Sequence, residues 1–295
     1  MDRKVECVNK DGVSIIFDES KWNPFILMKI EGIYDTEYRH TMPENTMTDG
    51  NTYLGGVQAA RNIVLYVQDM REESDYVVNR GAIDAVFKEG EGGTLFFTEG
   101  NSRAKKTTYV VEKITSDGMY YKRVHEISLI CCDPKMYDRY DATVHASEWR
   151  RAFTFPHRFP PEKEAFGYKS PERLVTINNR NAADNSGMEI IITGNGTITN
   201  PRLTVSETGS FIQIGRDDKP FSLRPSQKLV ICTEVGNKHI WLEEDGERTE
   251  INQYMTNDSS WIVLPRGIST MGYDARTGAE YISLKIVYKL RYPRA

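Results

Sequence analysis

The sequence predicts a mainly β protein built from two domains, and three observations support this. Apolar residues recur at every second position in many short segments, which is the period of a strand with one buried face. Gly, Asn, Asp and Pro separate these segments, and these residue types form tight turns. The chain has 295 residues, a length that as a prior corresponds to about two domains.

The clearest predicted strand covers residues 281–290, in which every even position is apolar and the odd positions are mostly polar. Residues 127–131 alternate in the same way, and residues 188–192 do so less cleanly because Ile191 is also apolar. Further strands are expected at residues 63–67, 95–98, 107–114, 174–177, 211–214, 229–232, 239–242 and 261–264. Asp-Gly steps supply the positive-φ positions of tight hairpins at residues 11–12, 49–50, 117–118 and 245–246.

One segment has helical spacing instead. Ser74 and Asp75 are candidate caps for a helix over residues 76–88, whose apolar face would hold Val78, Ala82, Ala85, Val86 and Phe87. Gly81 weakens this helix by about 1 kcal/mol relative to Ala. The glycine-rich residues 90–93 end it, and they lack the Gly-Lys-Ser/Thr ending of a phosphate-binding loop.

The domain boundary is expected after Pro134. Residues 135–171 are irregular and carry a cluster of aromatic residues and prolines between Phe153 and Phe166, and alternation resumes at Leu174. A connection of this length is either an inter-domain linker or an extended arm. The sequence therefore predicts an N-terminal domain over residues 1–134, and a connector with a C-terminal β-sandwich over residues 135–295.

Composition excludes several functional classes. The chain has 38 Lys plus Arg against 42 Asp plus Glu, a net charge of −4, so no basic stripe is expected and recognition of nucleic-acid sequence is not predicted. Mean hydropathy is −0.53 and no apolar run approaches 18 residues, so no transmembrane helix and no membrane association are expected. Charges at Asp2, Arg3 and Lys4 occupy the place where a signal peptide would need apolar residues, so export by that route is not expected.

The sequence also predicts no metal, no cofactor and no enzymatic activity. Cys131 and Cys132 are adjacent and would point to opposite faces of a strand, while Cys7 and Cys232 stand alone, so we expect four reduced thiols. The five histidines have no ligand spacing. The acidic groups around residues 133–141 and 243–247 fall in the connector and at a predicted turn, where carboxylates are normally solvated. An enzyme on a β scaffold stays a third hypothesis.

Two tryptophans are candidate sugar-stacking residues. β-Sandwich lectins stack an indole on the apolar face of a sugar, and Trp241 and Trp261 both lie in the C-terminal half. Each belongs to a short run that is apolar on either side, which favours packing in the core. Both interpretations remain open at this point.

Several motifs follow one another along nearly the whole chain. In the first half they lie at residues 11–17, 30–33, 48–51, 61–65, 80–87 and 93–97. Residues 127–134, a strand that ends in Asp-Pro, make the best local match, and the second half adds residues 153–156, 175–179, 190–194, 200–205 and 264–267. In this order the motifs resemble the distal tail protein family of long-tailed phages and phage-like tail particles.

The resemblance implies an N-terminal ring-forming domain, β-sandwich-like with one helix, followed by a galectin-like β-sandwich. It also implies a structural virion protein, a homohexameric ring that joins the tail tube to the tail tip or baseplate. The implied partners are the tail tube protein, a tail-tip hub protein and receptor-binding proteins, with assembly in the host bacterial cytoplasm. The alternative function is a carbohydrate-binding module that recognises the host cell surface.

Residues 34–51 form a connection that is too long for a simple hairpin turn. Its apolar side chains would be exposed, which suggests an arm that contacts a neighbouring subunit. The residues expected in this inter-subunit arm are Tyr38, Arg39, His40, Met42, Pro43 and Met47. The alternative is a surface loop that contacts no other chain.

Overall fold

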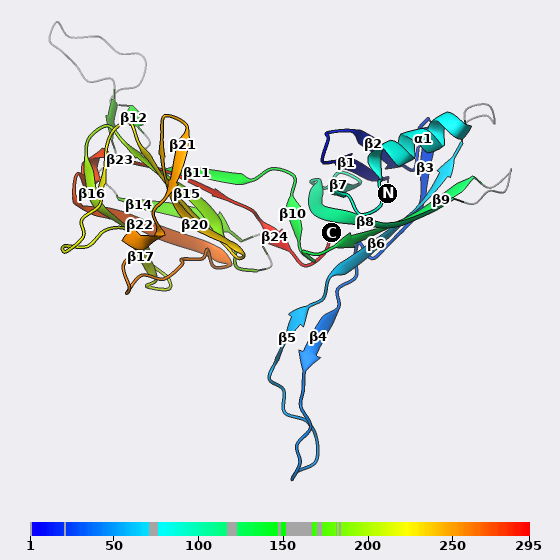
Figure 1. Ribbon diagram of the computed structural model, residues 1–295, viewed down its shortest axis with the longest axis horizontal. Helices are drawn as coiled ribbons and strands as arrows, with labels where there is room; N and C mark the ends of the chain where they lie inside the picture. The colour runs from blue at the N-terminus through cyan, green and yellow to red at the C-terminus, as the bar shows by residue number, and fades with distance from the viewer. Residues whose placement is uncertain are drawn as a thin grey trace, which may run out of the picture. The chain divides into compact units, whose positions relative to one another are not determined.

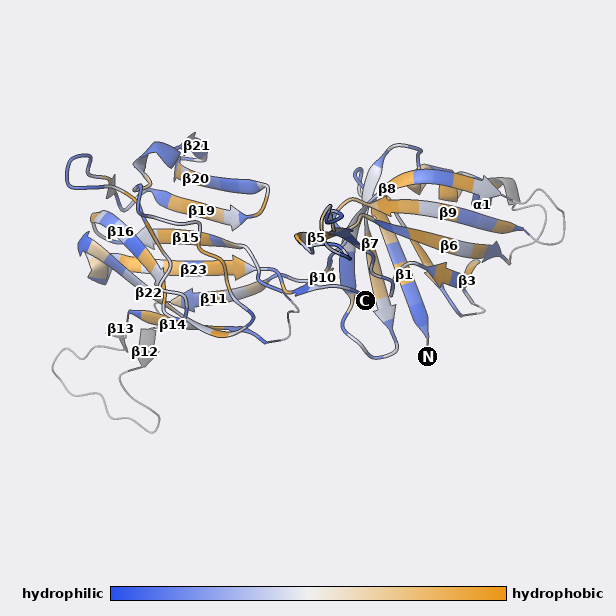
Figure 2. Cartoon of the chain, turned by 90° about the horizontal axis from the view of Figure 1, so that it is seen from below, coloured by the Kyte–Doolittle hydropathy of each residue, from blue (hydrophilic) through white to orange (hydrophobic). Residues whose placement is uncertain are grey.

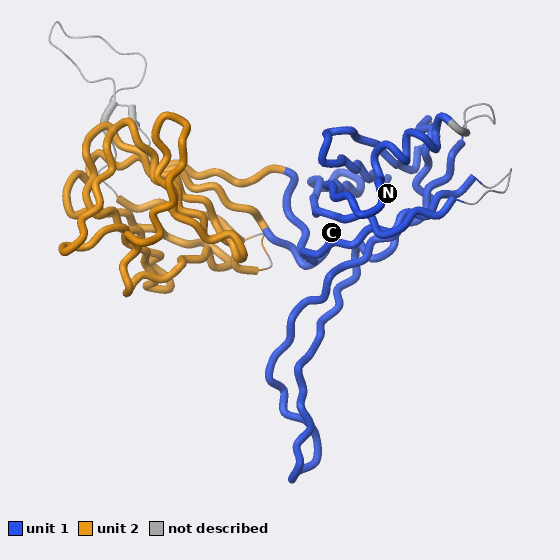
Figure 3. The backbone as a smooth tube through the Cα atoms, in the orientation of Figure 1, with its two compact units in different colours: residues 1–139, 291–295 blue, residues 140–290 orange. Residues whose placement is uncertain are grey.

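The computed structural model describes residues 2–20, 22–70, 76–116, 123–146, 149–151, 167–169, 173–180, 182 and 184–295. These residues form a mainly β protein with one α-helix, which confirms the predicted fold class. The chain divides into two compact units (Figure 3). Unit 1 comprises residues 1–139 and 291–295, and unit 2 comprises residues 140–290. The described residues contain no helix with the length and hydrophobicity of a membrane span.

Seven strands of unit 1 close into a barrel (Figure 1). Their order is β8-β7-β1-β2-β3-β6-β9, and pairing between β8 and β9 completes the ring. The strands are β1 (Arg3–Asn9), β2 (Ser14–Asp18), β3 (Phe25–Glu31), β6 (Arg61–Asp69), β7 (Gly92–Glu99), β8 (Lys105–Ser116) and β9 (Val124–Cys131). Every neighbouring pair is antiparallel except β2 and β3, which share a single parallel register pair. The resemblance implied a sandwich-like arrangement for this domain, and alternation alone does not reveal whether a sheet closes.

The barrel interior is the core of unit 1. Alternate side chains of β6 point inward, so Ile63, Leu65 and Val67 are fully buried, and Figure 2 shows this alternation of hydropathy along the strands. Each such burial contributes about 1.5–3 kcal/mol. Phe17 of β2 stacks on Phe87 with ring centroids 6.1 Å apart, which joins the barrel wall to the segment after the helix.

Helix α1 (Tyr76–Val86) confirms the predicted helix, and the predicted buried face is right at Val86 and Phe87 but wrong at the other three positions. Val78, Ala82 and Ala85 are exposed, whereas the buried positions are Asn79, Ile83, Val86 and Phe87. Asn79 is a polar residue on the buried stripe, and its Nδ2 donates to both carboxylate oxygens of Asp69 at 3.0 and 2.9 Å. The predicted caps Ser74 and Asp75 lie outside the described residues.

The boundary between the units differs from the predicted one. Met136 is fully buried in the core of unit 1, and Tyr137 pairs with Lys106, so the chain leaves unit 1 after Arg139 and not after Pro134. These residues form β10 (Met136–Asp138), which also pairs with β24 (Arg291–Tyr292) near the end of the chain. The aromatic and proline cluster between residues 153 and 166 lies outside the described residues.

Unit 2 contains two antiparallel sheets. The six-stranded sheet consists of β11 (Ala142–Ala146), β23 (Ile282–Tyr288), β15 (Met188–Gly194), β19 (Lys228–Glu234), β20 (Asn237–Glu244) and β21 (Glu247–Glu250). The five-stranded sheet consists of β14 (Leu174–Asn179), β22 (Gly267–Thr277), β16 (Ile198–Val205), β17 (Phe211–Gln213) and β18 (Ser222–Leu223). A separate strand pair joins β12 (Trp149–Arg151) to β13 (Gly167–Lys169). Likeness to galectins stays a prediction.

One turn and one segment of unit 2 can be compared directly with the sequence predictions. Asp245 and Gly246 both have positive φ, 51° and 86°, and they connect β20 to β21 as the Asp-Gly step predicts. Residues 261–264 do not form the expected strand. Ile262 and Leu264 are fully buried, and Leu264 makes only an isolated bridge with Ser186. The alternation of apolar residues therefore reflects alternate burial in a segment that has no continuous backbone pairing with a neighbouring strand.

Candidate interaction surface

A long hairpin extends from the barrel of unit 1 between β3 and β6 (Figure 1). We call residues 34–59 the arm. Its paired strands are β4 (Tyr38–Thr41) and β5 (Gly55–Gln58), and a bridge between Glu44 and Asn51 continues the pairing toward the tip. The predicted long connection is therefore an ordered two-stranded ribbon.

The arm carries exposed apolar side chains along its length. From Tyr34 to Leu54 every residue is exposed, and Met47 near the tip has 95% of its surface accessible. The large exposed apolar residues of the paired and returning segments are Tyr38, Met42, Tyr53, Leu54 and Val57. A two-stranded hairpin is only marginally stable without a partner surface, because it covers little of its own apolar area. The apolar side chains of the arm are therefore left uncovered by the rest of unit 1.

An aromatic row lies along one part of the arm. The rings of Tyr38 and His40 stack with centroids 6.2 Å apart, and the ring of Tyr53 lies 5.7 Å from that of His40. Gly56 is opposite His40 in the register, and a Cβ there would come within 2.9 Å of the Arg39 carbonyl oxygen. The absent side chain at Gly56 leaves room for the imidazole beside it.

The base of the arm is tied to the barrel by a buried arginine. Arg61 is 6% exposed, and its Nη1 donates to the Ile33 carbonyl oxygen at 2.6 Å while its Nη2 donates to the Pro293 carbonyl oxygen. The Ala59 amide donates to the Glu37 carbonyl oxygen at 2.9 Å. Burial lowers the pKa of the Arg61 guanidinium from its usual value. The base of the arm, which we call its root, is thus fixed to the barrel, and most of the rest of the arm is exposed.

All six residues predicted for the inter-subunit arm lie on it and are exposed, namely Tyr38, Arg39, His40, Met42, Pro43 and Met47. The contact with another subunit stays a prediction. The predicted segment ended at Asn51 and therefore lacked Tyr53, Leu54 and Val57 on the returning side of the arm. The Gly55-Gly56 pair, which precedes a resumed alternation, was the available signal.

The two candidate sugar-stacking tryptophans are partly buried. Trp241 lies on β20, where the ring of His239 stacks on it with centroids 4.9 Å apart and the Arg248 guanidinium lies 5.3 Å from its centroid. His239 precedes Trp241 by two residues, and Arg248 is paired with Glu243, two residues after it, so both sides of the indole are flanked. Trp261 lies outside any strand, with the Lys238 amine 6.0 Å from its ring centroid. Sugar stacking on either indole stays a prediction.

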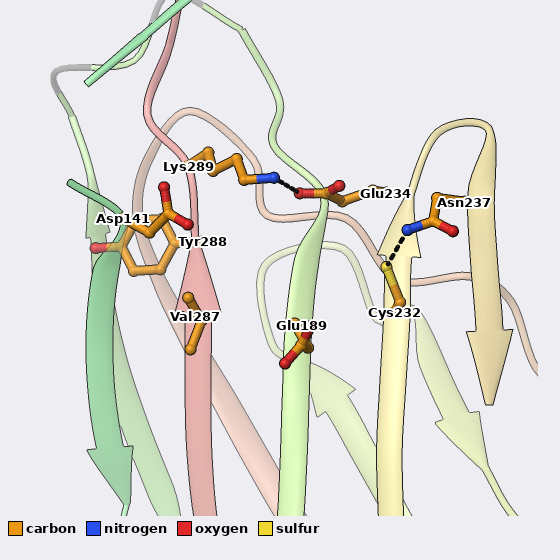
Figure 4. A pocket seen from close by; sticks show the side chains of 8 residues that line it. All are labelled: Asp141, Glu189, Cys232, Glu234, Asn237, Val287, Tyr288 and Lys289. Carbon is orange, nitrogen blue, oxygen red and sulfur yellow. Dashed lines mark hydrogen bonds and ion pairs between the residues drawn. The ribbon is translucent and has the colours of Figure 1, made fainter. Parts of the chain in front are cut away.

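A small polar pocket of about 180 Å³ opens at one end of the six-stranded sheet (Figure 4). The Lys289 amine and the Glu234 carboxylate form an ion pair at 2.9 Å, and the Asn237 amide donates to the Cys232 sulfur at 3.7 Å. Burial opposes the charged form of Lys289, but the hydrogen bond that it donates to Glu234 and the attraction of the nearby negative groups together outweigh this and raise the pKa of Lys289. Burial likewise raises the pKa of the Cys232 thiol, which keeps it protonated and poorly nucleophilic.

The other cysteines are also thiols. Cys7 and Cys131 are buried and Cys132 is exposed. Burial raises the pKa of Cys7, and it raises that of Cys131 to about 11. Within the described ranges, no group of three or more His, Cys, Asp or Glu side chains is arranged to hold a metal ion.

No protein-family model and no curated protein matches the sequence. Solved structures do match. The crystal structure of SPP1 Dit (gp 19.1), described as a paradigm of the hub adsorption apparatus in phages that infect Gram-positive bacteria, has a TM-score of 0.66 and 12% identity, covering 98% of this chain and 99% of that chain. The phage P2 baseplate in its activated conformation with Ca has a TM-score of 0.56 and 10% identity, covering 100% of both chains.

The same P2 baseplate with Sr has a TM-score of 0.51 and 10% identity, covering 99% of both chains. These matches span both units, and the resemblance that the motif order indicated is confirmed at the level of the fold.

Proposed function

We propose that this chain, which has the fold of a phage Dit hub protein, is a structural component of the distal end of a phage or phage-like tail. In this role six copies form a ring that joins the tail tube to the tail tip or baseplate, and the protein catalyses no reaction. The whole-chain likeness to Dit and to the P2 baseplate supports the role. The arm is the single observation that carries the self-assembly.

The arm supplies both apolar area and hydrogen-bonding edges for a neighbouring subunit. In the described part of the chain, β4 and β5 pair only with each other, so the outer edge of each strand retains unpaired backbone groups. Such edges accept a strand from another chain. A ring that closes requires a heterologous contact, in which the arm of one subunit meets a different surface of the next.

Charge substitutions on the arm test this proposal. The triple variant Met47→Asp, Leu54→Asp, Val57→Lys changes three exposed side chains, so the fold of unit 1 is expected to survive. If each side chain is buried in the ring, losing about 1.5 kcal/mol at each of three positions weakens association by more than about a thousandfold per interface. The matched control is Val235→Asp, which places a charge on an equally exposed apolar residue in the turn after β19.

Oligomeric state is measured by light scattering behind size exclusion at rising concentration. The wild type and Val235→Asp are expected to form the ring, and the arm variant is expected to remain a folded monomer. A ring that persists in the arm variant would show that the arm is not the inter-subunit contact. A wild type that stays monomeric at every concentration would contradict self-assembly.

A further inference from the structure

An open groove of about 410 Å³ lies on the outer face of the five-stranded sheet in unit 2, far in sequence from the arm. Leu203 of β16 and Met271 of β22 point inward and are buried, so the alternate positions Thr204 and Gly272 face outward. The lining residues are Arg173, Arg202, Thr204, Gly272, Tyr273 and Asp274. The volume is within the range of small-molecule sites.

The guanidinium of Arg202 is oriented in this groove by an aromatic ring. Its guanidinium carbon lies 3.8 Å from the centroid of the Phe211 ring, so the aromatic face orients the planar group and leaves its N–H edge exposed. Asp274 is opposite Arg202 in the register, yet its Oδ1 is paired with Arg173 Nη1 at 2.6 Å. Within the described residues the Arg202 guanidinium has no hydrogen bond or ion pair, although the backbone of Arg202 is paired in the sheet. The groove therefore presents an uncompensated cation.

Gly272 forms the floor of the groove. It lies in the interior of β22 between Thr204 and Leu174 of the neighbouring strands, and its φ is not in the left-handed region. A Cβ built there would meet only the Leu174 Cδ2 at 3.5 Å and other atoms at 3.9 Å, which are ordinary contacts. Packing and backbone geometry thus do not require glycine here, and a glycine inside a strand commonly marks a place where a ligand approaches closely.

We propose that this groove binds an acidic saccharide, a sugar unit that carries a carboxylate. The Arg202 fork matches a carboxylate in geometry and charge. The Thr204 hydroxyl and the exposed Asp274 carboxylate add a donor-acceptor and an acceptor beside it. Sugar hydroxyls both donate and accept, so this mixture suits a polyhydroxylated ligand that also carries a carboxylate. This proposal rests on neither ring assembly nor the arm.

The test is NMR titration of the full chain with glucuronic acid. Wild type is expected to show saturable shifts at the groove, and glucose is expected to bind at least about tenfold more weakly, because a charged hydrogen bond contributes about that factor. Arg202→Gln and Gly272→Val are each expected to weaken glucuronic acid binding by about tenfold or more. The Cβ of Gly272→Val makes only ordinary contacts, so the variant is expected to fill the groove and to keep the fold.

The matched control is Arg276→Gln. Like Arg202→Gln, it removes one positive charge, but from β22 and outside the groove lining. Arg276 pairs there with Asp217 at 2.6 Å, so glucuronic acid binding is expected to change by less than about twofold. Equal loss in Arg276→Gln would overturn the proposal in favour of a diffuse charge effect. Inorganic phosphate or a tri-glutamate peptide binding as tightly as glucuronic acid would overturn the saccharide assignment. Absence of saturable binding in the wild type would overturn the site itself.

Discussion

Replacing Arg61 with Met tests whether a buried guanidinium fixes the root of the arm. Arg61 reaches the Ile33 carbonyl oxygen at 2.6 Å on one side and the Pro293 carbonyl oxygen on the other, so it connects the arm to the returning end of the chain. Met keeps an unbranched apolar side chain of similar reach and removes both donors. The change therefore isolates the hydrogen bonds from the packing.

The expected loss is about 2 kcal/mol of the free energy of unfolding of unit 1. Each carbonyl left without its donor costs about 1–3 kcal/mol, which gives about 2–6 kcal/mol for the pair. Removal of a guanidinium that is almost fully buried returns part of this, because its desolvation cost of several kcal/mol disappears. Arg61→Lys keeps a charge but can reach only one carbonyl, so about half of the loss is expected.

Urea denaturation of the two variants measures the change in unfolding free energy, and hydrogen exchange measures the arm root. The Ala59 amide, bonded to the Glu37 carbonyl oxygen at 2.9 Å, is expected to exchange at least about tenfold faster in Arg61→Met. Arg248→Met is the control, because Arg248 is an exposed surface cation. A loss below about 0.5 kcal/mol in Arg61→Met, with unchanged exchange at Ala59, would refute the reasoning.

Two further predictions concern a backbone approach and a titration. Gly32→Ala is expected to destabilise unit 1 by more than about 4 kcal/mol, because its φ is +76° and the new Cβ would lie 1.8 Å from the Asn62 carbonyl oxygen. Gly12→Ala, with φ +83° and no atom within 4 Å, is expected to lose only about 1 kcal/mol, and equal losses in urea denaturation would contradict the clash. The hydrogen bond from Lys228 at 2.7 Å lowers the pKa of Glu243, so its stabilisation is present above the unfolded-state pKa and is lost as pH falls through the folded-state pKa. Lys228→Met is expected to raise the Glu243 titration midpoint measured by NMR, and an unmoved midpoint would contradict this pairing.

Local patterns were enough to predict most strands. Where one face is buried and the other wet, as in β6 or β23, each residue reports its own environment through its hydropathy. The Asp-Gly turn at residues 245–246 was predictable for the same reason, since its positive φ values depend on those two residues alone.

Features that depend on distant parts of the chain were not predictable. The closing pair β8–β9 and the two-residue strand β24 have no local signature, because hydrogen-bond partners are not encoded in alternation. The buried face of α1 was only partly predicted, because Asn79 is polar and its burial is explained by the hydrogen bonds that it donates to Asp69. Trp261 was predicted to lie in a strand because an extended segment with alternate buried residues has the same two-residue hydropathy period as a paired strand.

The candidate interaction surface was likewise predictable in part. Its existence followed from the length and exposed-type residues of the connection after β3. Its root did not, because Arg61 and Pro293 are separated by 232 positions in the sequence. The groove at Gly272 was also invisible, since Arg202, Phe211 and Asp274 converge only through the register of β16, β17 and β22.

The most direct test of the central claim is the oligomeric state of the unaltered chain. Light scattering behind size exclusion at rising concentration, with negative-stain images of the largest species, reports both mass and shape. The account predicts a species of six times the 33.8 kDa chain mass that images as a ring with a central hole. A single-chain mass at every concentration, with no ring in the images, would contradict it.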